Sequence, residues 1–153
     1  MAKISADTIK KLRDQTGAGV MNVRKALQES DGDVKKAKEI LKEKGMEIAA
    51  SKAGRATSAG FISTYVHHDG TSGAIVRLAC ETDFVARTDE FRNLAKELAM
   101  QGTAMNPSST DELLKQEYIR DPEKTVKELV AEVSAKTGEN IQVKEIKRVS
   151  VND

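Results

Sequence analysis

Apolar residues recur every three or four positions through residues 4–44, the spacing that places them on one face of an α-helix. The pattern is interrupted at Gly17 and Gly19 and again at residues 31–33, where turn-forming residues gather. It predicts three short amphipathic helices, the third of which ends at Gly45. Their apolar positions are Ile9 and Leu12 in the first helix, Val20, Val23 and Leu27 in the second, and Val34, Ala37, Ile40 and Leu41 in the third.

Three helices of this length form a compact bundle with a small core. We therefore expect an N-terminal three-helix module over residues 1–46. Residues 47–60 consist largely of Ala, Ser and Gly, and we interpret them as a linker that can be partly helical.

The hydrophobic pattern changes to a period of two after the linker. Residues 61–66 alternate between two faces, residues 68–73 are turn formers, and residues 74–80 are almost continuously apolar. These three runs predict a β-hairpin. Residues 141–149 are predicted to form a last strand, which can pair with the hairpin into a three-stranded antiparallel sheet.

Helical patterns return between the hairpin and the last strand. One helix is predicted to reach about Gln101, a short one to begin at Thr110, and a third to begin at a capping box of Thr125 and Glu128 and to end at Gly138. Without the short helix, the order is β-β-α-α-β, which is α+β rather than alternating βαβ. We expect residues 61–153 to form this second domain, with its helices on one face of the sheet.

Composition narrows the function classes. Net charge is +1, but residues 1–55 carry an excess of basic residues and the remainder an excess of acidic ones. This asymmetry fits an acidic partner, nucleic acid or simply a solvated helical surface. Direct nucleic-acid binding is disfavoured because residues 1–55 contain no aromatic side chain for base stacking. No Gly-rich phosphate loop is present, so we expect no bound nucleotide cofactor.

Cys80 is the only cysteine, which fits a reducing compartment. We find no signal-peptide pattern and no apolar run long enough for a membrane span, so we expect a cytoplasmic protein. Cys80 with His67 and His68 is far from a metal-binding pattern, and adjacent histidines on a strand would point to opposite faces. An apolar run around Cys80 would raise its pKa, so we expect neither a metal site nor an enzyme.

Residues 81–87 leave a buried strand and enter a helix, a place where a chain can expose residues on a rigid base. Asp83 lies at the start of a helical turn, and Phe84 is one of three Phe in the chain. The same pattern is also typical of a plain strand-to-helix turn, with Thr82 as cap and Phe84 in the core. Spacing alone leaves both interpretations open.

The chain resembles a known family in two long segments and a short one. Residues 12–27 (LRDQTGAGVMNVRKAL) are similar to the N-terminal signature of the elongation factor Ts family, and residues 80–86 (CETDFVA) to its second signature. Residues 138–141 (GENI) resemble the start of its core strand. The resemblance covers nearly the whole chain, in the right order. Residues 32–41 also resemble the third helix of ubiquitin-associated (UBA) domains, which favours a UBA-like N-terminal bundle.

The resemblance implies a guanine nucleotide exchange factor that binds elongation factor Tu carrying GDP and disturbs the site holding magnesium and phosphate. By that similarity, Phe84 would wedge between two helices of the GTPase and Asp83 would help to displace groups that hold Mg²⁺. The implied exchange segment is Thr82, Asp83, Phe84 and Val85. The positions that match partner contacts in the N-terminal module are Lys10, Arg13 and Met21.

The chain departs from longer family members because only one core unit is visible and residues 107–125 leave little room for a long hairpin. Family members with one core unit pair as dimers, so we expect a homodimer formed through residues 61–153. An alternative function is a UBA-type protein-binding module fused to an unrelated α+β domain. An exposed Asp83-Phe84 pair would favour the exchange factor, whereas the alternative allows the pair to be buried.

Overall fold

The N-terminal part of the chain is helical in the computed structural model, which describes residues 3–153. Met1 and Ala2, with which the predicted module begins, lie outside the described residues. Three helices follow, α1 (Ala6–Thr16), α2 (Val20–Glu29) and α3 (Val34–Lys52). The interruptions predicted from the sequence are present, since Gly17 ends α1 with a left-handed backbone, φ 71°.

The helices α1–α3 enclose a small apolar core. Its fully or almost fully buried members are Leu12, Val23, Ala26, Leu27, Ala37 and Leu41. Two residues predicted to face this core do not: Val20 and Val34 are 43% and 40% exposed. Each is the first residue of its helix.

The prediction that the third helix ends at Gly45 is wrong. Helix α3 continues through Gly45 to Lys52 and packs along α7 (Val126–Thr137). A glycine inside a helix costs about 1 kcal/mol relative to alanine, and packing against a neighbouring helix outweighs that cost. The division of the chain at residues 46 and 60 stays a prediction. One continuous helix, α3, crosses the first of these two boundaries.

The second part of the chain combines a sheet with helices. Its main sheet has the order β1-β2-β5, antiparallel throughout, with Ala59 opposite Cys80 and Val66 opposite Gly73 in the hairpin. The elements are β1 (Ala59–Val66), β2 (Ser72–Cys80), α4 (Asp83–Ala86), α5 (Asp89–Met105), α6 (Thr110–Lys115), β3 (Glu117–Tyr118), β4 (Asp121–Thr125), α7 and β5 (Gln142–Ser150).

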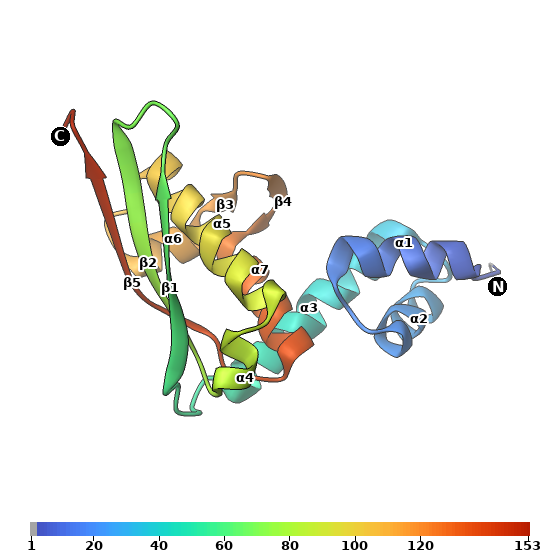
Figure 1. Cartoon of the computed structure of the whole chain (residues 1–153). Coiled ribbons are helices and arrows are strands. Elements are labelled where there is room, and N and C mark those ends of the chain that lie inside the picture. Colours follow the sequence, from blue (N-terminus) through green and yellow to red (C-terminus); the bar gives the residue numbers. More distant parts are fainter. Residues whose placement is uncertain (1–2) are drawn as a thin grey trace.

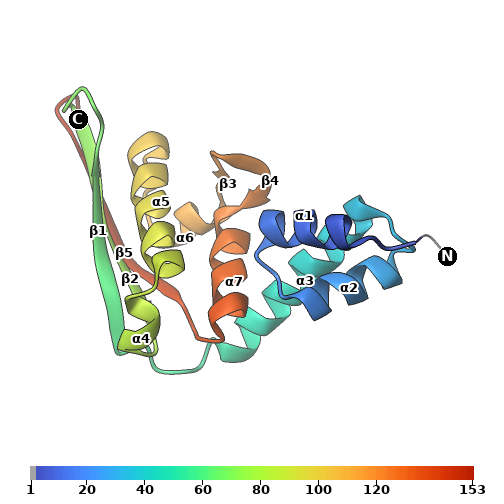
Figure 2. The ribbon, with the colours of Figure 1, turned by 45° about the vertical axis from the view of Figure 1, so that its right-hand side comes forward.

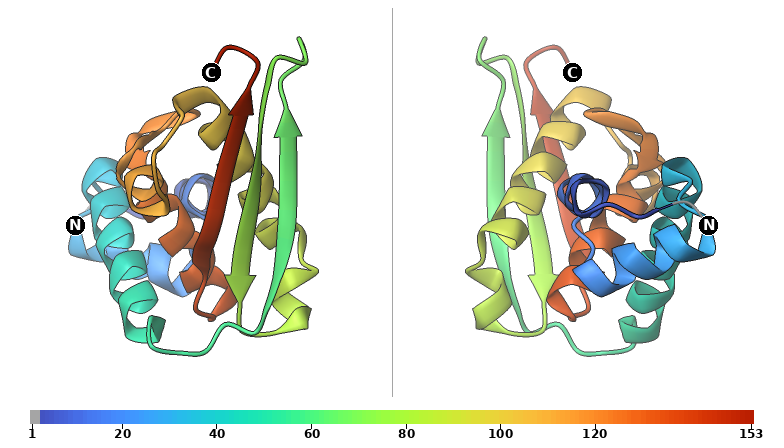
Figure 3. Two further views of the ribbon diagram at one scale, coloured as in Figure 1. Left: turned by 90° about the vertical axis from the view of Figure 1, so that its left-hand side faces the viewer. Right: turned by 90° about the vertical axis from the view of Figure 1, so that its right-hand side faces the viewer.

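The helices cover one face of this sheet and leave the other uncovered (Figures 1 and 3). Helix α5 lies directly against β1 and β2, with Phe91 and Leu98 fully buried between them. Gly102 allows close approach, because a Cβ there would collide with the Ile146 side chain of β5. The predicted α+β class, a helical bundle followed by a three-stranded antiparallel sheet with helices, is confirmed.

The sequence-based order omitted a small hairpin, β3–β4. Two-residue strands show no periodicity, and Pro122 within β4 argues against a strand. The hairpin is held by Gln101, which is completely buried on α5. Its side chain donates to the Glu117 carbonyl and accepts from the Ile119 amide, both at 3.0 Å.

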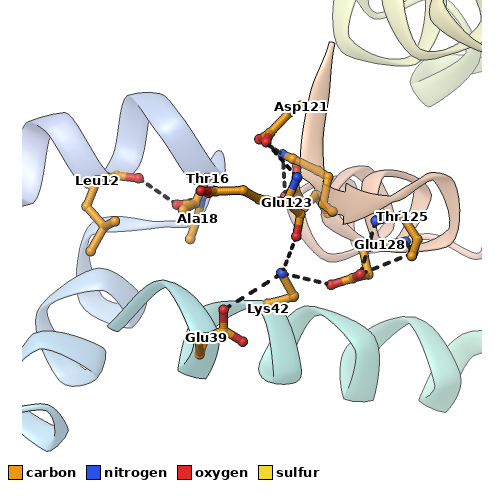
Figure 4. Close-up of polar contacts among 11 residues, drawn as sticks. Leu12, Thr16, Ala18, Glu39, Lys42, Asp121, Glu123, Thr125 and Glu128 are labelled. Carbon is orange, nitrogen blue, oxygen red and sulfur yellow. Dashed lines mark hydrogen bonds and ion pairs between the residues drawn. The ribbon is translucent and has the colours of Figure 1, made fainter. Parts of the chain in front are cut away.

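The N-terminal helices are attached to the rest of the molecule through α3 (Figure 2). Lys42 on α3 donates to the Glu123 carbonyl at 2.9 Å and pairs with the Glu128 carboxylate at 3.3 Å (Figure 4). Glu128 also closes the predicted capping box with Thr125 at the start of α7. One lysine therefore connects the bundle to the capped end of α7.

Within residues 3–153, no helix combines the length and apolar character that crossing a membrane requires.

Candidate functional site

The connection between β2 and α5 presents the residues singled out in the sequence. After Cys80, the chain makes a short turn into the single-turn helix α4. Thr82 caps α4 by accepting from the Val85 amide at 3.3 Å, and Thr88 caps α5 by accepting from the Phe91 amide. Two threonine caps thus bracket residues 83–87 and define the direction in which the turn projects.

The turn divides into an exposed half and a buried half. Thr82, Asp83 and Phe84 are exposed, and Phe84 is 84% exposed, the highest value among the large apolar side chains described. Val85 and Ala86 are each 6% exposed and belong to the core beneath α5. The prediction therefore placed four residues together, of which the structure points three outward and uses Val85 as an anchor.

The exposure of Phe84 contradicts the interpretation that places its side chain in the core. Phe91, seven residues later, is completely buried, so the fold has room for an aromatic side chain in its core but does not put Phe84 there. A large apolar side chain held outward on a capped turn has the form of a binding anchor.

The turn is supported from a distant part of the chain. Glu139, in the connection between α7 and β5, accepts hydrogen bonds from the backbone amides of Glu81 and Thr82. The sequence indicated the end of a helix at Gly138 and the start of a strand after it, but not this contact. No local signal in the sequence could have found this contact, because its partners lie at the end of another strand.

Cys80 and the two histidines lie at opposite ends of the hairpin and form no common site. Cys80 is completely buried, donates to the Thr82 carbonyl at 3.2 Å, and has a pKa raised by burial, as expected from the apolar run. The expectation that His67 and His68 point to opposite faces is wrong. Their ring centroids are 4.2 Å apart because β1 ends at Val66 and the histidines already belong to the turn.

The predicted docking residues of the N-terminal module are all on its surface. Lys10 and Arg13 lie one helical turn apart on α1, and Met21, on α2, is 62% exposed. The structure does not bring them close to Phe84. Helices α1 and α2 lie beyond α3 and α7, whereas α4 lies at the lower end of the sheet (Figure 2).

A groove lies beside the docking residues, bordered on one side by the end of α1 and the start of α2. It runs between α3 and the β4–α7 segment, and its lining includes Arg13, Lys42, Ile48, Glu123 and Lys136 but none of residues 82–85. Among residues 3–153, no cluster of His, Cys, Asp and Glu has the arrangement of a metal site. The exposed turn is thus suited to contact another macromolecule rather than to enclose a small ligand.

Comparison with known proteins identifies similar chains. Residues 81–153 match the family model described as "Elongation factor TS". A protein named elongation factor Ts from Thermoanaerobacter sp. (strain X514) is 41% identical over 190 positions, which cover 95% of this chain and 93% of that protein. One of the same name from Clostridium botulinum (strain ATCC 19397 / Type A) is 46% identical over 149 positions, covering 97% of this chain and 48% of that protein.

The two relatives differ from this chain in length. The chain spans about half the length of the Clostridium protein. The span matched in the Thermoanaerobacter protein is 190 positions, more than the 153 residues of this chain, so that relative carries internal residues which this chain lacks.

Proposed function

The chain belongs to the elongation factor Ts family, and we propose that it binds elongation factor Tu carrying GDP and promotes release of the nucleotide. The family consists of exchange factors, not enzymes, and no covalent step is needed. A factor that binds the nucleotide-free GTPase more tightly than the GDP-bound form weakens GDP binding by the same factor. The proposal implies activity in the cytoplasm, where translation takes place.

Phe84 is the observation that carries this proposal. Its side chain is 84% exposed at the tip of a turn whose next two residues are buried. Inserted between helices of the partner, the ring would lose its contact with water, a transfer that favours binding. Asp83, beside it at the first position of α4, would bring a carboxylate toward the groups that hold Mg²⁺. Magnesium holds the diphosphate tightly, so displacing those groups would weaken GDP binding.

The N-terminal module supplies a second contact in this proposal. Lys10 and Arg13 present basic groups to an acidic surface of the GTPase, while the exposed Met21 offers a flexible apolar contact. Because these residues and Phe84 lie far apart on the molecule, one partner must span both surfaces. Docking by the module would then hold the turn at a high local concentration near the nucleotide.

The alternative of a UBA-type module fused to an unrelated domain explains the helical bundle but not the other observations. The matched relatives cover 95–97% of the chain, across both the bundle and the sheet. The alternative also gives no reason for the exposed Asp83-Phe84 pair, which was the feature expected to separate the two functions.

Release of fluorescent GDP from elongation factor Tu tests the proposed function. The wild-type chain at catalytic amounts is expected to accelerate release, and Phe84→Ala to slow the saturated rate in proportion to a loss of about 2–4 kcal/mol, the range typical of a buried aromatic anchor. Phe61→Leu, which changes a half-buried Phe on β1, is the control. Absence of acceleration by the wild type would reject the proposal, and full activity of Phe84→Ala would reject the wedge.

We further propose that the chain forms a homodimer through the uncovered face of its sheet (Figure 3, left). Ile62, Val66 and Val149 are 57%, 66% and 72% exposed on that side. Arg77 and Glu145 lie opposite each other on neighbouring strands of the same face. Such a face is self-complementary under two-fold symmetry, because Arg77 of one copy can meet Glu145 of the other.

Light scattering tests the dimer. A mass of twice 16.7 kDa is expected for the wild type. Val149→Lys, which introduces a charge into the apolar part of the face, is expected to give the monomer mass. The same substitution at Ile119, an exposed residue of the β3–β4 turn, should leave the dimer intact. A monomeric wild type at micromolar concentration would contradict the proposal.

A further inference from the structure

Glu139 approaches the exchange segment with both carboxylate oxygens. One oxygen accepts from the backbone amides of Glu81 and Thr82, each at 3.0 Å, and the other accepts from the Thr82 hydroxyl at 2.7 Å. Three donors at the base of the turn are thus satisfied by a single side chain that is more than fifty residues away in sequence. Hydrogen bonds to a carboxylate are shorter and stronger than those between neutral groups.

The contact with Glu139 also determines how Thr82 caps the helix. A threonine hydroxyl has one proton to donate and lone pairs with which to accept. Because its proton is directed to Glu139, the oxygen is left to accept from the Val85 amide at the start of α4. The orientation of the cap, and with it the direction of the single helical turn that carries Phe84, therefore depends on Glu139.

Glu139 is itself held in place by its neighbours. Gly138 ends α7 with φ 77°, and the Ser134 hydroxyl, almost fully buried, donates to the Glu139 carbonyl at 2.6 Å. In return for the contact from Glu139, the Glu81 carboxylate accepts from the Asn140 amide at 2.7 Å. In each direction, therefore, a backbone amide of one segment donates to a glutamate carboxylate of the other.

The same cluster includes the segment that leads from α3 to β1. Asn140 is 3% exposed, and its side-chain amide donates to the carbonyls of Ala53 and Arg55 at 3.3 and 2.8 Å. The Arg55 guanidinium in turn lies 3.7 Å from the Glu81 carboxylate. The backbone on three sides of the turn is therefore connected through one polar cluster.

We propose that Glu139 is a positioning residue for nucleotide exchange: it fixes the backbone at residues 81–82 so that Phe84 projects into the partner. This role rests on the proposed function, because it acts through Phe84. A small misplacement of a group at a reaction centre can reduce a rate by about a hundredfold, so loss of this support should affect the exchange rate more than the stability of the fold.

The first test measures GDP release from elongation factor Tu in a double-mutant cycle. Glu139→Ala is expected to slow the saturated rate about tenfold or more, but by less than about twofold when Phe84 is already alanine. Glu139→Gln keeps an oxygen for the two amides but puts an NH₂ group where the Thr82 hydroxyl donates, so its rate is expected to lie between those of the wild type and Glu139→Ala. Glu47→Ala, at an exposed glutamate on α3, is the matched control and should match the wild type.

Equal losses from Glu139→Ala in both backgrounds would overturn the proposal, because they would mean that Glu139 acts on the partner or on the fold without Phe84. An unchanged rate in Glu139→Ala, with Phe84→Ala impaired, would also overturn it. If the wild type itself fails to accelerate release, it is the proposed function that fails.

The second test needs no partner. Amide hydrogen exchange followed by NMR should show faster exchange at Glu81 and Thr82 in Glu139→Ala, with unchanged protection in the centre of β2 and α5. Glu139→Gln should protect both amides as the wild type does. Unchanged hydrogen-exchange rates at these two amides would overturn the positioning role, whatever the nucleotide-exchange activity of the chain.

Discussion

The two surfaces that we propose to meet elongation factor Tu are built differently. Lys10, Arg13 and Met21 stand on α1 and α2, helices of 11 and 10 residues whose opposite sides form the core of the bundle. Phe84 stands on α4, which has only four residues and cannot hold its own direction. Threonine caps and the carboxylate of Glu139 provide that direction instead.

This difference in construction predicts how each surface should respond to substitution. On a regular helix, the backbone sets where a side chain points, so removing one contact changes affinity and leaves its neighbours in place. On a single turn, the hydrogen bonds of remote residues set the direction, so their loss moves the whole surface. We therefore expect the bundle to contribute mainly to docking and the turn mainly to the rate of nucleotide release.

The largest expected effect comes from emptying the small core of the bundle. Leu27→Ala removes a completely buried side chain and should lower the free energy of unfolding of the bundle by about 2–5 kcal/mol. Hydrogen exchange should then show loss of protection in α1–α3, while β2 and α5 remain protected. Loss of protection in both regions together would show that bundle and sheet unfold as one unit, which would contradict a separate response of the two regions.

Arg13→Ala tests whether docking and nucleotide release depend on different surfaces. The concentration giving half the maximal exchange rate should rise about tenfold, the equivalent of about 1.4 kcal/mol, because a charged contact is lost from the docking surface. The saturated rate should stay within about twofold of the wild type, in contrast to Phe84→Ala. Lys36→Ala, at an exposed position on α3, serves as control. A fall in the saturated rate of Arg13→Ala would contradict separate roles.

The smallest effect is expected at the junction of the two regions. Lys42 and Glu128 form a partly exposed pair, 28% and 18% exposed, so Lys42→Met should lower stability in urea by less than about 1 kcal/mol. Lys44→Met, which breaks a pair with Glu29 inside the bundle, is the matched control. If Lys42→Met but not Lys44→Met raised the half-maximal concentration, the junction would also orient the bundle for docking.

Helix starts and ends were predicted correctly where the residues that determine them lie nearby in the sequence. The capping box of Thr125 and Glu128 and the glycine at the end of α7, Gly138, both act within four residues of their own positions. Apolar spacing likewise identified most of the bundle core. The end of α3 was missed because its continuation past Gly45 depends on α7, which lies about eighty residues further along the chain.

Only part of the candidate site was predicted, because only part of it depends on residues that are close in sequence. The sequence indicated residues 81–87 by the local pattern of a capped turn after a buried strand, and its resemblance to the family narrowed these to residues 82–85. It did not separate Val85, which is buried, from Phe84, which is exposed, since that depends on where α5 packs. The support from Glu139 had no local signal at all, because its partners lie on another strand end.

The sequence alone predicted the α+β class, most of the helices and strands and the position of the turn after β2, because caps, glycines and apolar periodicity act over a few residues. It missed the β3–β4 hairpin and the end of α3. Only the tertiary structure decided the order β1-β2-β5, which face of the sheet remains uncovered, and which remote carboxylate supports the turn. Those features arise when segments far apart in sequence meet, and their free energies depend on contacts that no single segment contains.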